Sequence, residues 1–70
     1  MTLVEKSHKN ENYYITVEVQ MGWHTPYYEV QVCPRISDCE CGYPIKKITY
    51  CLNDKKKAYA TFNRYKRKYV

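Results

Sequence analysis

The chain has 70 residues and a formal net charge of +5, and none of its apolar runs approaches the roughly 20 residues that a membrane-spanning helix needs. A domain this small buries only about 60% of the surface that its unfolded chain exposes, so its core is a single layer, such as a sheet covered by one helix. Such a core leaves little room for a deep cleft. Length and composition therefore argue against an enzyme and favour one binding domain spanning residues 1–70.

The first clear element is a strand predicted over residues 13–21, where apolar and polar side chains alternate with a period of two. Its apolar positions are Ile15, Val17, Val19 and Met21. Before this strand, residues 7–12 are polar and are expected to form a loop. Residues 3–5 add a short edge strand at most.

A second strand is predicted over residues 27–33, after a short hairpin loop between Gly22 and Pro26. Its inward positions are Tyr28, Val30 and Val32, and its outward positions are Tyr27, Glu29, Gln31 and Cys33. Pro34 is expected to end the strand or to sit at its edge, because proline cannot donate a hydrogen bond to a ladder.

A longer loop is expected over residues 35–44, followed by a third strand over residues 45–52. The inward positions of this strand are Ile48, Tyr50 and Leu52, and its outward positions are Lys47, Thr49 and Cys51. Ile45 and Lys46 fit the alternation poorly, which indicates a bulge or a late start of the strand.

The last element is a helix predicted over residues 54–68, with Asn53 or Asp54 as its N-cap. Apolar side chains recur at helical spacing and form a stripe that must cover the sheet, since no other segment can. The stripe consists of Ala58, Phe62, Tyr65 and Tyr69. The predicted fold is α+β: a three-stranded antiparallel β-meander, four-stranded if residues 3–5 pair, packed by one C-terminal helix (βββα).

The positive charge is concentrated on this helix. Residues 53–70 contain seven Lys or Arg and one Asp, a net charge of +6, whereas residues 1–52, with five basic and six acidic side chains, carry −1. Such asymmetry indicates an acidic partner, either a nucleic acid or an acidic protein face. A membrane fits poorly, because the sheet needs the apolar side of the helix.

The candidate binding residues on the helix are Lys55, Lys56, Lys57, Arg64, Arg67 and Lys68. Cations in the last turn complement the helix dipole, but Lys55, Lys56 and Lys57 in the first turn oppose it at a cost of about 0.3–1 kcal/mol each. A run kept despite a local cost indicates a role outside folding. The alternative is a solvated face that keeps a small protein soluble.

Two further binding candidates, Trp23 and Tyr27, lie at the tip of the first hairpin. Trp23 either folds back over the open end of the thin core, which the small size of the domain favours, or stands exposed as an anchor for a partner.

The cysteines have two possible uses. Cys39 and Cys41 are separated by one residue, a shorter spacing than is common at zinc sites, and only Cys33 is near enough to join them. Free thiols are therefore favoured over zinc, and no other cofactor is expected. Catalysis is not expected, since the two histidines are predicted to lie in loops away from these thiols.

In its size, its β-β-β-α order and its basic tail over residues 55–70, the chain resembles small proteins of phages and other mobile elements, including some anti-CRISPR inhibitors. Those inhibitors share no common fold, so the resemblance assigns no residue roles. Many of them are acidic mimics of nucleic acid. A basic chain is instead expected to contact an acidic protein face or bound nucleic acid.

Three functions follow as hypotheses. The first is a non-enzymatic inhibitor that docks its basic helix on a host nucleoprotein machine. The second is a small DNA- or RNA-binding domain that contacts phosphates, with Tyr14 or Tyr27 as stacking surfaces. The third is a zinc-stabilised module. A cytoplasmic location is expected, since residues 1–6 do not resemble an export signal. For a phage or mobile-element protein, as the resemblance implies, this is the cytoplasm of the bacterial host. An exposed edge strand could also pair two copies into a homodimer.

Overall fold

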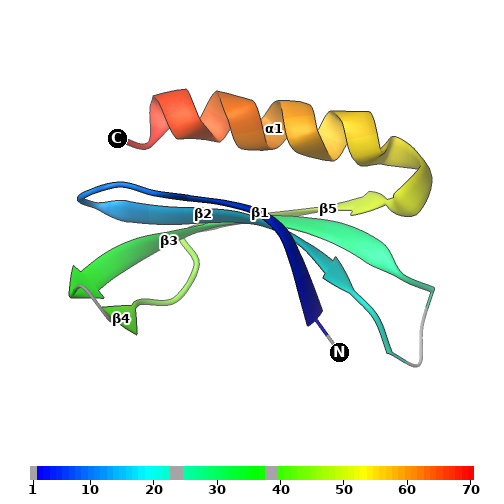
Figure 1. The fold of residues 1–70 in the computed structure, drawn as a ribbon, viewed down its shortest axis with the longest axis horizontal. Helices are drawn as coiled ribbons and strands as arrows, with labels where there is room; N and C mark the ends of the chain where they lie inside the picture. Colours follow the sequence, from blue (N-terminus) through cyan, green and yellow to red (C-terminus); the bar gives the residue numbers. More distant parts are fainter. Residues whose placement is uncertain (1, 23–24, 38–39) are drawn as a thin grey trace.

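The computed structural model describes residues 2–22, 25–37 and 40–70. An antiparallel sheet has the strand order β1-β2-β3-β5, and a short strand, β4, pairs with the far end of β3. The strands are β1 (Thr2–Lys9), β2 (Tyr13–Gln20), β3 (Tyr27–Ser37), β4 (Glu40–Cys41) and β5 (Lys46–Cys51). A 3-10 turn, η1 (Leu52–Asp54), leads into α1 (Lys55–Lys68), which lies across one face of the sheet (Figure 1). The predicted α+β meander with one C-terminal helix is confirmed.

The core lies between α1 and the sheet. Its fully buried strand side chains are Ile15, Val17, Val30 and Val32. From the helix, Ala58, Phe62 and Tyr65 are at most 4% exposed, and Tyr69 packs edge-on against Tyr13 with ring centroids 5.4 Å apart. The predicted helical stripe is therefore confirmed, and the buried Thr61 is a member that the apolar pattern could not include.

The N-terminal region differs from the prediction. β1 runs for eight residues, whereas at most a short edge strand over residues 3–5 and a loop over residues 7–12 were expected. Seven of the eight side chains are exposed, so the strand needs no apolar alternation. Its pairing with β2 shifts register between Val4 and Lys6, which also breaks the period of two. Hydrogen bonding to β2 defines this strand, and only residues 10–12 form a turn, in which Asn10 Oδ1 accepts from two backbone N–H groups.

The expectation that Pro34 ends or edges the second strand is wrong. β3 continues to Ser37, and part of the loop expected over residues 35–44 forms β4. At Pro34 the neighbour of β3 changes: Ile45 N donates to Val32 O at 2.8 Å, and Gly42 N donates to Pro34 O at 2.8 Å. A proline fits here because its carbonyl accepts the hydrogen bond from the neighbouring segment, so the missing N–H is not needed.

Two apolar residues that were expected to point inward are exposed. Met21 is 36% exposed and Leu52 is 41% exposed, because β2 ends at Gln20 and β5 ends at Cys51. Leu52 belongs to η1, where the chain turns from the sheet toward the helix. The helix itself begins at Lys55, and Asp54 occupies the N-cap position without a side-chain cap hydrogen bond.

Polar contacts fix α1 at several points along its length. The Tyr50 and Thr61 hydroxyls lie 2.6 Å apart, the Tyr59 phenol donates to Glu5 at 2.6 Å, and Asn10 Nδ2 donates to the Tyr69 carbonyl at 2.8 Å. These contacts hold the helix by its sheet-facing side and its end. The opposite side of α1 is left to solvent.

The hydrogen bond to Glu5, aided by burial, raises the pKa of Tyr59 from 10.0 to about 12. Because the phenol donates only while protonated, this contact contributes fully below about pH 10 and is lost as the pH rises through about 12. We expect Glu5→Gln to bring the pKa of Tyr59 back toward 10, since a neutral amide accepts a weaker hydrogen bond from the phenol than a carboxylate does and does not repel the phenolate. An NMR titration of the Tyr59 ring measures this change. An unaltered value in Glu5→Gln would mean that the carboxylate does not cause the shift.

Candidate binding surface

Six of the seven cations of α1 are exposed, and the seventh, Lys66, is half-buried. We define the basic face as Lys55, Lys56, Lys57, Arg64, Lys66, Arg67 and Lys68. None of these side chains forms an ion pair with a residue that the structure describes. The candidate binding residues of the helix thus share one surface, and their charge is not neutralised within the described fold.

Some cations of the basic face also have a structural contact. Four of them lie over aromatic rings, with centroid distances between 5.3 and 5.6 Å: Lys55 over Tyr59, Arg64 over Tyr65, Lys66 over Phe62 and Lys68 over Tyr69. Such contacts are worth about 0.5–1 kcal/mol at exposed sites. Lys56, Lys57 and Arg67 have no comparable contact with any described residue. Folding therefore does not account for these three side chains.

The charge at the start of α1 is unfavourable for the helix. Its first turn contains no acidic residue, and its last turn contains Lys66, Arg67 and Lys68. The last-turn cations stabilise the helix dipole, whereas the first-turn lysines (residues 55–57) oppose it. Lys56 and Lys57 thus destabilise the helix electrostatically, and neither has an ion pair or an aromatic contact with a described residue.

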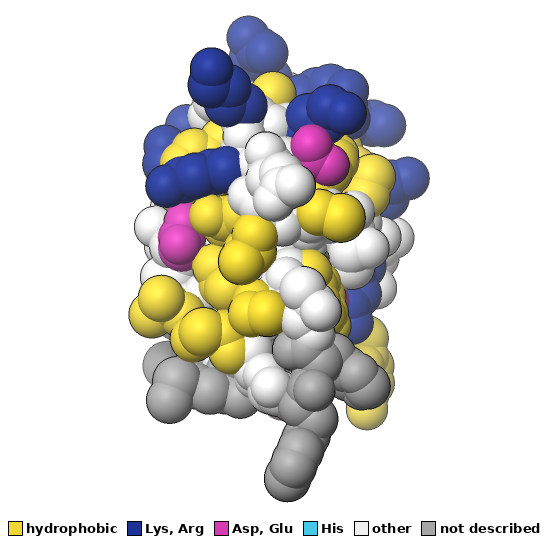
Figure 2. All heavy atoms as spheres, turned by 90° about the vertical axis from the view of Figure 1, so that its right-hand side faces the viewer, with side chains coloured by type: hydrophobic (Ala, Val, Ile, Leu, Met, Phe, Trp, Pro, Cys, Tyr) yellow, Lys and Arg dark blue, Asp and Glu magenta, His cyan; other side chains and the backbone are white. Residues whose placement is uncertain are grey.

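A shallow hollow adjoins the end of the sheet from which the chain enters α1. This end hollow has a volume of about 480 Å³ and is lined by Thr25, Pro26, Tyr27, Cys51, Leu52 and Asn53. Figure 2 shows hydrophobic side chains gathered in the middle of this end of the molecule, with Lys and Arg above them. Tyr27 is 36% exposed and lines the hollow, while Trp23 lies outside the described residues. The sequence analysis missed Leu52 as a surface residue, because its place in the alternation indicated the core.

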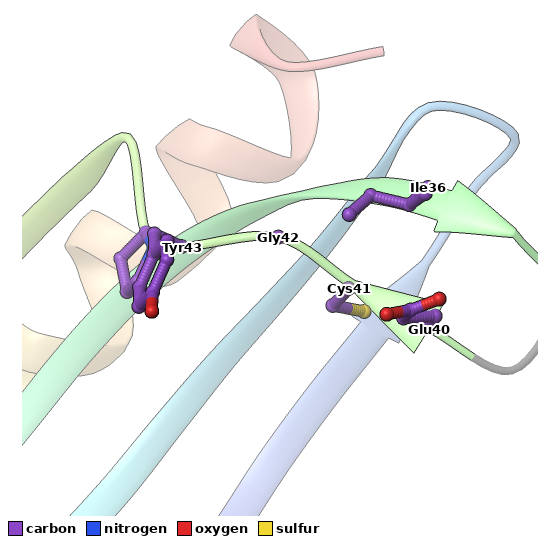
Figure 3. A pocket seen from close by; sticks show the side chains of 6 residues that line it. Ile36, Glu40, Cys41, Gly42 and Tyr43 are labelled. Atoms are coloured by element: carbon purple, nitrogen blue, oxygen red, sulfur yellow. The ribbon is translucent and has the colours of Figure 1, made fainter.

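A second hollow lies at the opposite end of the sheet, around β4 (Figures 1 and 3). It is lined by Ile36, Glu40, Cys41, Gly42, Tyr43 and Pro44. Ile36 is 66% exposed and Tyr43 is 93% exposed. Figure 3 places Ile36 on β3, Glu40 on β4 and Tyr43 on the connection toward β5. Its lining includes the carboxylate of Glu40, whereas the residues that line the end hollow carry no charge.

The face of the sheet opposite α1 carries a polar network that the sequence analysis expected to be solvated. Instead, Thr16 and Glu29 are only 3% and 4% exposed. The Gln31 amide donates to Glu29 and to Glu18, and Lys47 Nζ lies 3.6 Å from Glu29 Oε1. The polar side chains of this face are thus largely paired with one another, and its two carboxylates share the face with Lys9 and Lys47.

The cysteines remain candidates without a complete site. Burial, aided by the charges of Cys41 and Glu18, raises the pKa of the Cys33 thiol, which lowers its thiolate fraction at neutral pH. Cys41 is exposed, and Cys39 lies outside the described residues. Among the residues that the structure describes, no three His, Cys, Asp or Glu side chains gather as metal ligands. Zinc at Cys33, Cys39 and Cys41 therefore stays a prediction.

Cys33 and His8 do not form a Cys–His pair of the catalytic kind. Cys33 pairs with Tyr14 in the ladder and faces away from α1, whereas His8 pairs with Ile15 and shares the helix side of the sheet. Cys33 and His8 therefore lie on opposite faces. The second histidine, His24, lies outside the described residues.

The fold and surface define a small α+β domain that presents a basic helix beside an apolar hollow. No protein family model, no curated protein and no solved structure was found to match the chain. In the part of the chain that the structure describes, no helix is long and apolar enough to cross a membrane.

Proposed function

We propose that this chain is a small non-enzymatic binding protein that docks the basic face of α1 on an acidic protein or nucleoprotein surface. As in the phage and mobile-element inhibitors that it resembles, the partner would be a host nucleoprotein machine. One observation carries the proposal. The basic face is exposed, it has no ion pair with the described residues, and it includes Lys56 and Lys57, which oppose the helix dipole.

The electrostatics of such a surface suit docking. Charges of one sign raise the rate of encounter with an opposite partner, and the effect falls with ionic strength. α1 is attached to the sheet through its other side, so a partner can reach the basic face without disturbing the core. A face that only maintains solubility would not require cations at the one helix end where they are unfavourable.

The experiment is a pull-down from cells of the native host. The test variant combines Lys56→Glu, Lys57→Glu and Arg64→Glu. A matched control combines Lys6→Glu, Lys9→Glu and Lys46→Glu, which changes the net charge equally but lies on the strands. We expect the partner to be lost with the helix variant and retained with the control. Retention by both variants would show that the basic face serves solubility alone.

Nucleic-acid binding is the second candidate function, because an uncompensated row of cations also suits phosphates. The structure separates Tyr14 from these cations, since Tyr14 pairs with Cys33 and Lys9 on the face away from α1. Of the two stacking candidates, only Tyr27 lies at the end of the sheet next to the first-turn lysines. Duplex and single-stranded oligonucleotides distinguish this function, because their binding should weaken steeply with salt, with a slope of about −0.9 per duplex phosphate neutralised. Failure of both to bind at low salt would exclude it.

A further inference from the structure

The end hollow and the first-turn lysines form one continuous surface. Leu52 and Asn53 line the hollow, and Asp54 alone separates them from Lys55. Figure 2 shows cations above the hydrophobic side chains, with acidic side chains at the boundary between the two. The walls are mainly apolar, and Leu52 and Tyr27 remain 41% and 36% exposed. An apolar depression with positive charge on one rim has the layout of a protein interface, with a core for an anchor residue and a polar edge.

We propose that this surface binds an acidic protein segment, which inserts one bulky apolar side chain into the end hollow and pairs its carboxylates with Lys56 and Lys57. This inference deepens the proposed function and rests on it, since it names the docking end and the class of the partner. The charge of the rim selects an acidic segment. The apolar walls of the hollow favour a ligand with a bulky apolar side chain, which a uniformly charged ligand lacks.

Two features favour a protein over a nucleic acid at this surface. The cations stand on one rim only, whereas a nucleic-acid strand is normally tracked by a charged groove. Among the residues that line the hollow, Tyr27 alone has a ring on which a base could stack, whereas Pro26 and Leu52 suit an apolar anchor side chain.

The β4 hollow supplies a natural control. Ile36 is more exposed than Leu52, at 66% against 41%, but its hollow contains Glu40 in place of a lysine rim. The other end of α1 supplies a graded comparison, since Arg67 and Lys68 belong to the same basic face but lie at the far end of the helix from the end hollow (Figure 1). Leu52→Asp can thus be compared with Ile36→Asp, and Lys56→Glu/Lys57→Glu with Arg67→Glu/Lys68→Glu, since each pair makes the same kind of change at a different place.

The probe is a random peptide library displayed on phage and selected against the wild-type protein at low salt. We expect the selected peptides to combine several Asp or Glu with one large apolar residue. For a synthetic peptide of the consensus sequence, Leu52→Asp and the double variant Lys56→Glu/Lys57→Glu are each expected to raise Kd about tenfold or more. The control Ile36→Asp is expected to change Kd by less than about threefold. Arg67→Glu/Lys68→Glu, which lies on the same basic face but far from the end hollow, is expected to raise Kd less than Lys56→Glu/Lys57→Glu does.

An NMR titration of the wild-type protein with the same peptide keeps the test independent of how the variants fold. We expect the largest amide shifts at Tyr27, Cys51, Leu52 and the first-turn lysines. A library without binders, selected peptides without acidic residues, or shifts centred on the uncovered face would each overturn the inference.

The two proposals can fail separately. Equal weakening by the two double charge reversals, with no effect of Leu52→Asp, would preserve docking through the basic face and reject the end hollow as its centre. If neither double reversal weakens binding, the inference and the proposed function both fail. Oligonucleotides that bind wild-type protein and compete with the peptide at the first-turn lysines would reject a protein partner there.

Discussion

Phe62→Ala is expected to lower the free energy of unfolding by about 3–5 kcal/mol, the largest effect of any single substitution considered. Phe62 is 3% exposed and belongs to the one helix that covers the sheet in the described structure. Phe62 belongs to the same buried cluster as β-branched side chains from β2 and β3, such as Val17 and Val30. Little else is available to fill the space, so the cavity term adds to the lost burial.

This loss is large relative to the whole stability of the domain. At about 0.05–0.15 kcal/mol per residue, 70 residues give a total of about 4–10 kcal/mol. We therefore expect Phe62→Ala to be partly or wholly unfolded at 37 °C, as measured by urea denaturation followed by circular dichroism. Leu52→Ala is the control, because an exposed apolar residue should change stability by less than about 0.5 kcal/mol. A small effect of Phe62→Ala would mean that α1 does not hold the sheet as described.

Charge reversal at the two ends of α1 is expected to change stability in opposite directions. Lys56→Glu/Lys57→Glu places negative charge in the first turn and should stabilise the fold by about 0.3–1 kcal/mol per substitution. Arg67→Glu/Lys68→Glu places it in the last turn and should destabilise the fold by a similar amount. Loss of the contact between Lys68 and the Tyr69 ring adds to the second effect.

The two double variants change the net charge of the protein equally, so general charge repulsion cannot produce opposite signs. Thermal unfolding at low ionic strength measures both, and added salt should reduce both shifts. Stabilisation by Lys56→Glu/Lys57→Glu would show that the wild-type lysines are kept at a cost to folding, as a binding role requires. If Lys56→Glu/Lys57→Glu is destabilised like Arg67→Glu/Lys68→Glu, the helix dipole does not govern these positions. The first-turn position of Lys56 and Lys57 would then be no evidence for a binding role.

Local periodicity was sufficient to predict the core elements. Ile15, Val17 and Val19 alternate because one face of β2 is buried, and Phe62 and Tyr65 recur at helical spacing because one side of α1 is buried. Each pattern reflects burial on a single side and needs no knowledge of the partner. The same reasoning assigned the cations of α1 to solvent.

The edges of the sheet could not be predicted in this way. β1 is a strand because its backbone pairs with β2, and its side chains are almost all exposed, so the side-chain pattern carries no strand signal. β4 exists because β3 continues past Pro34 and supplies a partner for Cys41. Pairing of this kind depends on which backbone groups meet in space, which a local pattern does not encode.

The candidate surface divides in the same way. The amino-acid sequence by itself determined the charge of the basic face and the sheet-covering stripe, because both follow from side-chain type and helical spacing. Only the tertiary structure decided that Leu52 faces solvent, that Glu29 is buried on the uncovered face, and that Tyr27 and Leu52 line one hollow next to the first-turn lysines. These facts depend on where β5 ends and on how the chain turns into α1, and such positions are fixed by packing between segments that are distant in sequence.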